Sequence, residues 1–193
     1  MDMLELLTTR RTYRRFDESR AIEDAAIRDM MEAFRLSSSA VNAQRLRAIF
    51  VRTPELVQKI FPLTHWAGAL PAELGVPKEG ERPTLFVLLT IDSEARTRYT
   101  DIDAGIALSN ITMAAWAHGV GSCIMDNIER DAIKDVLGLA ATTEIHSAIG
   151  LGYPTHHSTI VDVPESGKLA YYLDENKDYF VPKRSITELC TEM

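Results

Sequence analysis

One stretch, residues 100–125, constrains the fold of this chain more than any other. Apolar residues recur at steps of three and four from Ile102 to Val120, which is the spacing of one face of a helix, and the other faces are also largely apolar. A helix that is apolar almost all round is normally buried on most sides, inside a core or between subunits. Ser109 and Asn110 interrupt it, and it is too short to read as a membrane span.

The ends of this stretch predict how the helix begins and how the chain continues. Thr100 and Asp103 have the spacing of a capping box, and Gly119 suits the left-handed residue that follows a helix end. The apolar run from Val120 to Met125 then predicts a buried strand. A helix, a tight turn and a buried strand form half of an α/β unit, so the order of elements alone favours a parallel α/β sheet.

Composition places the chain among ordinary soluble proteins with one domain, residues 1–193. It has 46% hydrophobic and 25% charged residues and a net charge of −7, which argues against a general nucleic-acid binder. Any anionic ligand therefore needs a local basic cluster. Cys123 and Cys190 form no disulfide framework and no metal-ligand spacing, which favours a reducing compartment. Without a secretory signal or membrane segment, we expect a cytoplasmic protein.

A basic cluster of this kind lies near the N-terminus. Residues 10–15 contain four arginines, interleaved with Thr12 and Tyr13. Guanidinium groups bind phosphate bidentately, and hydroxyl groups add neutral donors. An anion site and a solvated basic patch paired with surface acids explain the pattern about equally well.

A polar segment without charge occupies residues 37–44. Its hydroxyl and carboxamide side chains offer both donors and acceptors, as the wall of a pocket for a heterocyclic ring requires. A polar turn around Asn42 is the simpler alternative and, on this segment alone, the favoured one.

The remaining pattern predicts the other elements. Helices are expected from Ile22 to Phe34 and over residues 54–60 and 127–137, and strands over residues 48–52, 84–91 and 144–151. Residues 62–83 hold four of the eight prolines and three of the ten glycines, which predicts a long loop that acts as a lid.

Two further features concern the second half of the chain. His156 and His157 are adjacent and have no third ligand at a known spacing, so we predict no metal site. The tail, residues 166–193, alternates aromatic and acidic residues and is expected to pack on a partner subunit. Within it, Ser185 and Glu188 form a capping-box pattern that follows two cations.

Several motifs in order along the chain resemble those of the FMN-dependent nitroreductase family. Residues 10–16, RRTYRRF, are similar to its R-R-S-x-R-x-F, and residues 37–44, SSSAVNAQ, to its A-P-S-x-x-N-x-Q. Residues 103–123 are similar to its D-x-G, L-A-A and G-L-G-S-C elements. Residues 149–154 resemble its G-Y-P element, and residues 181–184 its basic C-terminal motif. Each motif alone is weak, whereas the ordered set is fairly specific.

The resemblance implies an α+β fold with a mixed, mostly antiparallel central sheet surrounded by helices, in an intertwined homodimer that binds two FMN at the subunit interface. This overrides the parallel sheet favoured by element order. The residues it assigns to the FMN phosphate and ribityl chain are Arg10, Arg11, Thr12 and Arg14, with Lys183 and Arg184 at the phosphate. Those it places near the flavin are Ser37, Ser39, Asn42 and Gln44, with Ile124 and Met125 lining one flavin face.

The implied activity is an NAD(P)H oxidoreductase in which the cofactor carries the chemistry. NAD(P)H delivers a hydride to the flavin, and a nitroaromatic, quinone or related acceptor then takes the same space, giving ping-pong turnover. Positive charge and amide donors stabilise the reduced flavin. No side chain has to act as a nucleophile or general acid, so no catalytic residue is assigned.

The chain departs from the family pattern at three places. Ser38 replaces the proline before the serine of the second motif, Arg45 replaces the proline after its glutamine, and Met125-Asp126 replaces a Gly-rich step near the flavin. An inward-pointing Asp126 disfavours the reduced, anionic flavin. Two alternatives to the reductase stay open: a flavin carrier or sensor without turnover, and a module that binds another anion and no flavin.

Overall fold

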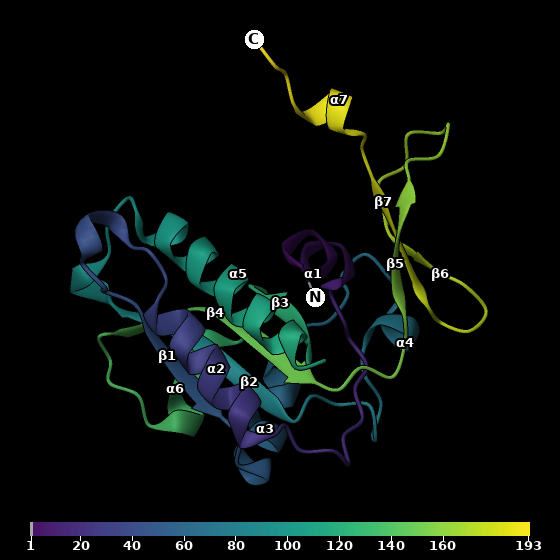
Figure 1. The fold of residues 1–193 in the computed structure, drawn as a ribbon. Coiled ribbons are helices and arrows are strands. Elements are labelled where there is room, and N and C mark those ends of the chain that lie inside the picture. The colour runs from purple at the N-terminus through teal and green to yellow at the C-terminus, as the bar shows by residue number, and fades with distance from the viewer. Residues whose placement is uncertain (1) are drawn as a thin grey trace.

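The computed structural model describes residues 2–193 and shows an α+β fold (Figure 1). Its centre is a four-stranded sheet in the order β1-β2-β4-β3, in which every neighbouring pair is antiparallel. The strands are β1 Arg47–Val51, β2 Leu85–Asp92, β3 Gly121–Met125 and β4 Thr143–Gly152. The antiparallel sheet implied by the resemblance is confirmed.

The parallel sheet favoured by element order is wrong for a specific reason. Strands β2 and β3 do run in the same direction, joined by helix α5 (Thr100–Ala117), as an α/β unit requires. Strand β4 lies between them and pairs antiparallel with both. The pattern of one strand, one helix and one strand cannot reveal which later strand separates the pair.

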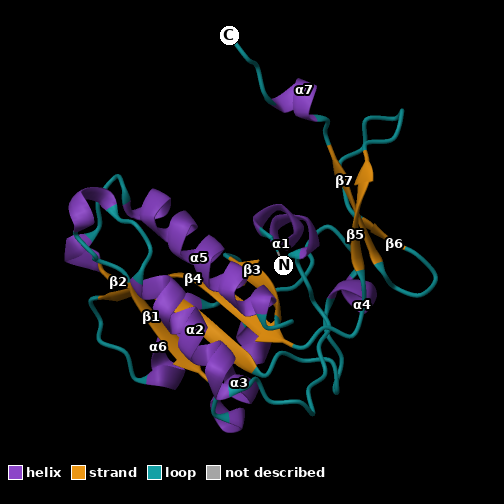
Figure 2. Ribbon diagram, viewed as in Figure 1, coloured by secondary structure: helices purple, strands orange, loops and turns teal. Residues whose placement is uncertain are grey.

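Helices cover both faces of the central sheet (Figure 2). Leu85, Val87 and Leu89 of β2 pack in one core with α2 (Asp24–Arg35) and α5. Phe86 and Leu88 point the other way, into a second core with α3 (Pro54–Ile60) and α6 (Arg130–Leu137). Because β2 is covered on both faces, its sequence is a continuous apolar run.

The ends of α5 test the predicted caps. Gly119 has a φ of +71°, the left-handed conformation predicted for it. The capping box at the start is wrong: Asp103 is buried, and its Oδ1 accepts a hydrogen bond of 2.9 Å from the Ala40 N–H. Asp103 therefore fastens the segment before β1 to α5. The α5 face that carries Ile102 is uncovered in the single chain, with Ile102 60% exposed.

The N- and C-terminal elements extend this core. Helix α1 (Met3–Thr9) is capped by Asp2 and packs near α5. A small sheet in the order β5-β7-β6 projects from the body, and α7 continues beyond it (Figure 1). These elements are β5 Ser158–Asp162, β6 Tyr172–Leu173, β7 Tyr179–Lys183 and α7 Ile186–Leu189. The predicted capping box of Ser185 and Glu188 is present.

The predicted loop 62–83 contains a short helix, α4 (Ala72–Gly75), and begins within a 3-10 turn, Phe61–Leu63. Trp66 is buried and packs where Gly150 lacks a side chain, whereas His65 is exposed and pairs with Glu129 at 2.7 Å. No helix within residues 2–193 is long and apolar enough to cross a membrane. The two other 3-10 turns are Ala40–Asn42 and Ser93–Ala95.

Candidate functional site

The arginine-rich segment is anchored to the edge of the sheet by its aromatic residues. The Tyr13 N–H donates to the Ser122 carbonyl at 2.9 Å. Tyr13 and Phe16 fill the space left by glycines: a Cβ on Gly121 lies 2.9 Å from the Tyr13 Cβ, and one on Gly152 lies 2.7 Å from the Phe16 Cβ. Because neighbouring residues of an extended segment point to opposite sides, burying the Tyr13 ring directs Arg14 outward, whereas Arg15 is buried. Arg10, Arg11 and Arg14 lie together on the outer side of this segment.

These arginines form one wall of a hollow of about 210 Å³, which we call the basic hollow. Its lining residues are Arg10, Arg11, Thr12, Arg14, Tyr171, Val181 and Lys183. The lining includes four cations and no carboxylate. The Nε atoms of Arg10, Arg11 and Arg14 are buried without a hydrogen-bond partner. Such a set of donors matches an anion with several oxygen acceptors.

The electrostatics of the basic hollow point in the same direction. Burial lowers the pKa of the Arg10 guanidinium, and burial together with the charge of Arg10 lowers the pKa of Arg11. Guanidinium groups nevertheless stay protonated in proteins. The cluster therefore holds unpaired positive charge in a partly desolvated place, which an anion stabilises.

Residues of the tail complete the basic hollow from the same chain. The Arg14 guanidinium carbon lies 4.6 Å from the centroid of the Tyr171 ring and 5.1 Å from that of Tyr179, so both rings make cation–π contacts. Lys183 of β7 lines the hollow, whereas Arg184 does not and lies 3.6 Å from Glu188. Sequence reasoning did not assign Tyr171 to the site. Its only signal was the clustering of aromatic residues in the tail.

The predicted segment 37–44 forms a strained loop. Val41, Asn42 and Gln44 have φ values of +50°, +53° and +47°, a region that residues other than glycine seldom adopt. For the β-branched Val41 this is a clear outlier, and its side chain is 92% exposed. Strain of about 1–3 kcal/mol per residue persists only where surrounding contacts fix it, and it concentrates at binding sites.

Hydrogen bonds to α5 and within the segment itself fix this loop. Besides the bond from Ala40 to Asp103, the Gln44 N–H donates to Ser39 Oγ at 3.1 Å, and the Asn110 side chain donates to Ser37 Oγ at 2.9 Å. The carboxamide of Gln44 donates to Asn42 at 3.2 Å. The loop is therefore held at both ends, while its tip faces solvent.

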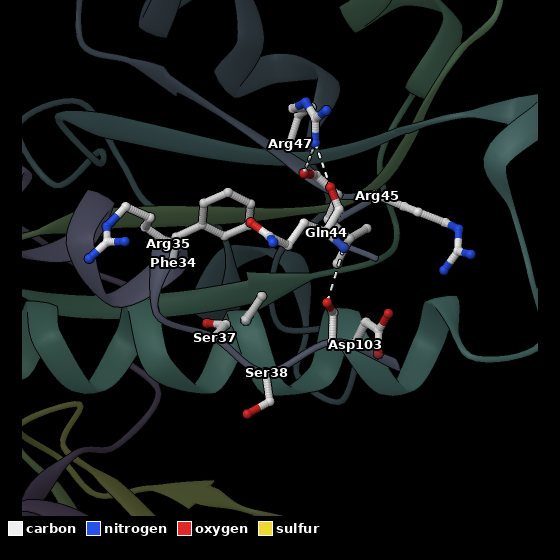
Figure 3. A pocket seen from close by; sticks show the side chains of 11 residues that line it. Phe34, Arg35, Ser37, Ser38, Gln44, Arg45, Arg47 and Asp103 are labelled. Atoms are coloured by element: carbon white, nitrogen blue, oxygen red, sulfur yellow. Dashed lines mark hydrogen bonds between the residues drawn. The ribbon is translucent and has the colours of Figure 1, made fainter. Parts of the chain in front are cut away.

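A second hollow, which we call the loop hollow, lies beside this segment and has a volume of about 190 Å³ (Figure 3). Its lining residues are Phe34, Arg35, Ser37, Ser38, Ser39, Gln44, Arg45, Leu46, Arg47, Asp103 and Ala107. Asn42 is not among them. The loop hollow shares no lining residue with the basic hollow.

Helix α5 connects the two hollows. Asn110 bonds to Ser37 at the loop, and two residues further on, Thr112 Oγ1 lies 3.5 Å from Arg10 Nη1. Within one chain, the predicted site residues thus fall into two groups on either side of this helix.

The end of β3 presents the last predicted residues. Ile124 is 42% exposed, whereas Met125 is buried in the second core because consecutive side chains of a strand point to opposite faces. Asp126 forms an ion pair with Arg130 and faces solvent. This pairing compensates the negative charge introduced by the departure from the family pattern.

Among the described residues, no group of three or more histidine, cysteine or acidic side chains is placed to hold a metal. The His156 ring is buried, and neither of its nitrogens has a hydrogen-bond partner. Burial, followed by the charge of Arg15, lowers its pKa to about 4. Cys123 is also buried, which raises the pKa of its thiol to about 11.

The fold and the two hollows define an α+β protein with a hollow lined by four cations. Residues 7–153 match the model of the nitroreductase family, and the chain belongs to that family. A relative in Methanothermobacter thermautotrophicus, provisionally named an NADH dehydrogenase/NAD(P)H nitroreductase, is 28% identical over 163 residues, which are 81% of this chain and 80% of the relative.

Solved structures share the fold. A provisionally named nitroreductase of Desulfovibrio desulfuricans, solved in complex with FMN, is 22% identical with a TM-score of 0.71; the match covers 100% of this chain and 98% of the other. An FMN-dependent nitroreductase of Clostridium difficile R20291 is 21% identical with a TM-score of 0.65, over 81% and 90% of the two chains. The resemblance found in the sequence is therefore confirmed at the level of the family.

Proposed function

We propose that this protein is an FMN-dependent NAD(P)H oxidoreductase that reduces nitroaromatic, quinone or related acceptors. The observation that carries the proposal is the basic hollow, where the buried Nε atoms of Arg10, Arg11 and Arg14 have no partner and no carboxylate lines the wall. The phosphate of FMN is a dianion with several oxygen acceptors, so its chemistry fits this donor set. The names of the relatives above support the same cofactor and reductant.

Each predicted residue has a role in this proposal. Arg10, Arg11, Thr12, Arg14 and Lys183 hold the phosphate and ribityl chain, and Arg184 adds positive charge nearby. Ser37, Ser39, Asn42 and Gln44 approach the flavin. Ile124 lines one of its faces, whereas the Met125 side chain is buried in the second core and leaves only its backbone for this role. The first group neutralises the phosphate charge, and the second presents hydroxyl and carboxamide groups to a heterocycle with alternating donors and acceptors.

We further propose that the active form is a homodimer with one FMN at each of two interfacial sites. The support is that one chain separates the basic hollow from the strained loop, while the α5 face bearing Ile102 is uncovered. A second copy placed on that face brings loop and hollow from different chains together. The tail and the segment 62–83 then border the space for the acceptor.

When held by Arg10, Arg11, Arg14 and Lys183, FMN would supply the redox chemistry between NAD(P)H and the acceptor. The chain's own residues bind and orient. Guanidinium groups fix the phosphate end, and the loop 37–44 is pre-organised by its hydrogen bonds, so little ordering is required on binding. Arg130 keeps the charge of Asp126 compensated. No side chain has to transfer a proton at the reacting atoms.

The first test is the visible absorption spectrum of the purified protein, with identification of any chromophore released on denaturation. We expect FMN at about one per subunit, and sustained NADH or NADPH oxidation when a nitroaromatic or quinone is added. Bound FMN without turnover identifies a carrier or sensor instead. A colourless protein that does not take up added FMN contradicts the proposal and leaves the basic hollow as a site for another anion.

A further inference from the structure

Arg15 differs from the arginines of the basic hollow because its side chain is buried. It is 7% exposed and does not line the hollow. In the pattern R-R-S-x-R-x-F, Arg15 stands at the variable sixth position, so the pattern does not require an arginine there. A buried guanidinium is costly unless polar groups surround it. Its contacts therefore indicate what the side chain does.

The Arg15 guanidinium joins three segments of the chain. Its Nη2 atom donates a hydrogen bond of 2.5 Å to the carbonyl of Lys177, which lies 162 positions further along the sequence. Its Nε atom lies 3.9 Å from Glu81 Oε1 in the segment 62–83, and its guanidinium carbon lies 5.8 Å from the centroid of the Tyr179 ring. Arg15 thus fastens the arginine-rich segment to the tail of the same chain.

Lys177 lies in the turn of a hairpin, residues 171–183, which we call the tail hairpin. The turn joins β6 to β7, and Lys177 has a φ of +62°, in a region that residues other than glycine seldom adopt. The carbonyl of Asp174 accepts the Lys177 N–H at 3.0 Å, and its Oδ1 atom accepts the Asp178 N–H at 2.8 Å. The turn is therefore fixed by its own hydrogen bonds, and Arg15 holds it from outside.

The tail hairpin supplies the part of the basic hollow that the arginine-rich segment does not. Tyr171, Val181 and Lys183 come from the hairpin, and the other four lining residues lie within residues 10–14. The basic hollow therefore depends on the hairpin lying against the arginine-rich segment. The hydrogen bond from Arg15 to Lys177 helps to keep it there.

We propose that Arg15 is a positioning residue, which anchors the tail hairpin and thereby slows the release of the FMN phosphate from the basic hollow. The identity of the anion rests on the proposed function, whereas the anchoring of the hairpin does not. Because Arg15 does not line the hollow, it acts through Lys177 rather than on the ligand. A hydrogen bond from a charged group contributes more than a neutral one, and differences in affinity among variants of one site appear mainly in the dissociation rate.

The anchoring is tested on the flavin-free protein by amide hydrogen exchange. Arg15→Met keeps a long side chain and removes the hydrogen bond to Lys177. The amides of Lys177, Asp178 and Tyr179 are all hydrogen-bonded, and we expect them to exchange about tenfold faster in this variant. The amides of β2 should keep their wild-type protection. Unchanged exchange in the hairpin overturns the proposal.

FMN binding then tests whether Arg15 acts through the hairpin. Arg15→Met should raise the Kd of FMN about tenfold, mainly by faster dissociation, and leave kcat at saturating FMN unchanged. In the Tyr171→Leu background, the same substitution should raise the Kd only about threefold, because part of what the hairpin contributes is already lost. Additive losses would show that Arg15 acts by its charge alone, and they overturn the proposal.

Two controls separate the hairpin from other effects of Arg15. Arg20→Met removes the same charge nearby, from a side chain that stacks on Tyr153 and does not line the basic hollow. Glu81→Gln removes the partner of Arg15 in the segment 62–83 and leaves the bond to Lys177. Both variants should keep wild-type exchange in the hairpin and change the Kd of FMN by less than about twofold. A loss in Glu81→Gln as large as that in Arg15→Met contradicts a role through the hairpin.

A second variant is available should Arg15→Met also lose the protection of β2. Arg15→Lys keeps the buried charge, and its side chain ends one atom before the Nη2 position, so its bond to Lys177 is weakened. It replaces Arg15→Met in both measurements. Unchanged hairpin exchange and unchanged FMN dissociation in Arg15→Lys overturn the proposal.

The outcomes separate this inference from the proposed function. A wild type that takes up no FMN contradicts the proposed function, and the exchange rates then decide alone whether Arg15 anchors the hairpin. FMN binding and turnover in the wild type, with no effect of Arg15→Met on exchange or on Kd, overturn this inference and leave the reductase in place.

Discussion

At the scale of single residues, the arginines of the basic hollow are arranged for a ligand at a cost to the free protein. Like charges lie close together, and three Nε atoms are buried without a partner. A buried donor without a partner costs about 1–3 kcal/mol. Such an arrangement lowers stability unless an anion satisfies the donors, so binding the anion should stabilise the fold.

Replacing Arg10 and Arg14 together by alanine should remove the cofactor without unfolding the protein. The variant loses two cations of the hollow and, with them, two buried Nε atoms that have no hydrogen-bond partner. We therefore expect the flavin-free variant to melt no lower than the flavin-free wild type. Flavin absorbance per subunit and thermal melting of both forms measure the two effects. Full flavin retention in the variant contradicts the phosphate assignment.

Tyr171 should position Arg14 rather than touch the reacting atoms. Its ring lies 4.6 Å from the Arg14 guanidinium carbon, a cation–π contact typically worth about 0.5–2 kcal/mol. Tyr171→Leu should therefore weaken FMN binding by roughly three- to thirtyfold, whereas Tyr171→Phe keeps the ring and should bind nearly normally. Titration of the flavin-free protein with FMN, followed by fluorescence quenching, gives both affinities. Equal losses in the two variants would assign the effect to the hydroxyl group instead.

His156 should make the protein sensitive to acid. Burial lowers its pKa from 6.5 to about 4, so between these pH values the unfolded chain binds a proton that the folded protein excludes. The contribution to stability is complete above pH 6.5 and is lost as pH falls through the window to about 4. Its size is on the order of 3 kcal/mol, which the free energy of unfolding measured by urea titration from pH 7 to 4 should reveal.

The control for this prediction lies next to His156 in the sequence. His156→Phe keeps the contacts with the Tyr13 and Tyr179 rings, whose centroids lie 5.4 and 4.9 Å away, and removes the titrating group. Its free energy of unfolding should fall less between pH 7 and 4 than that of the wild type. His157→Phe changes an exposed ring and should keep the wild-type loss. If the free energy of unfolding of the wild type and of His156→Phe changes with pH in the same way, the loss of stability in acid comes from other groups.

At the scale of elements, glycine gaps at the sheet edge place the arginine segment. Gly152→Ala sets a Cβ 2.7 Å from the Phe16 Cβ, a contact too close for either backbone to accept without shifting. We expect a loss of about 1–3 kcal/mol in stability and weaker flavin binding, because Phe16 anchors the segment that carries Arg14. Chemical denaturation and FMN titration measure both. Gly68→Ala, where nothing lies within 4 Å of the added atom, should be close to neutral.

At the scale of the whole molecule, the sequence predicts the elements well because their signals are local. The continuous apolar run of β2, the glycine after α5 and the capping box of α7 were all read correctly. The order of strands was not, because the insertion of β4 between β2 and β3 depends on contacts between distant segments. The role of Asp103 was missed for the same reason: its spacing from Thr100 fits a cap, and its partner Ala40 lies 63 residues away.

In the candidate site, too, the features with a local sequence signal were predicted and those that depend on distant segments were not. The arginine motif and the segment 37–44 were found from their composition, and five of the six residues predicted for the phosphate end line the basic hollow, all except Arg184. Tyr171 was missed because its partner, Arg14, is distant in sequence. The strain at Val41 has no local signal, since a β-branched residue normally predicts extended backbone.

The uncovered face of α5 leads to a prediction about assembly. Ile102 is 60% exposed, and neighbouring α1 exposes Met3 and Leu4 by 65% and 74%. Apolar side chains gathered on adjacent elements are typical of an interface between subunits. Sedimentation should therefore give a mass of twice 21.6 kDa for the wild type, and Ile102→Glu should shift it toward the monomer and release flavin, because the proposed site needs both copies.

A matched variant separates assembly from general solubility. Met31→Glu introduces the same charge at a position of α2 that is 44% exposed, and it should leave both mass and flavin content unchanged. A wild type that sediments as a monomer with full flavin would remove the need for a second copy, and the basic hollow and the strained loop would then have to serve different ligands. Joint loss of dimer and flavin in Ile102→Glu, with the Arg10 and Arg14 side chains intact, would instead tie the two hollows to one site across the interface.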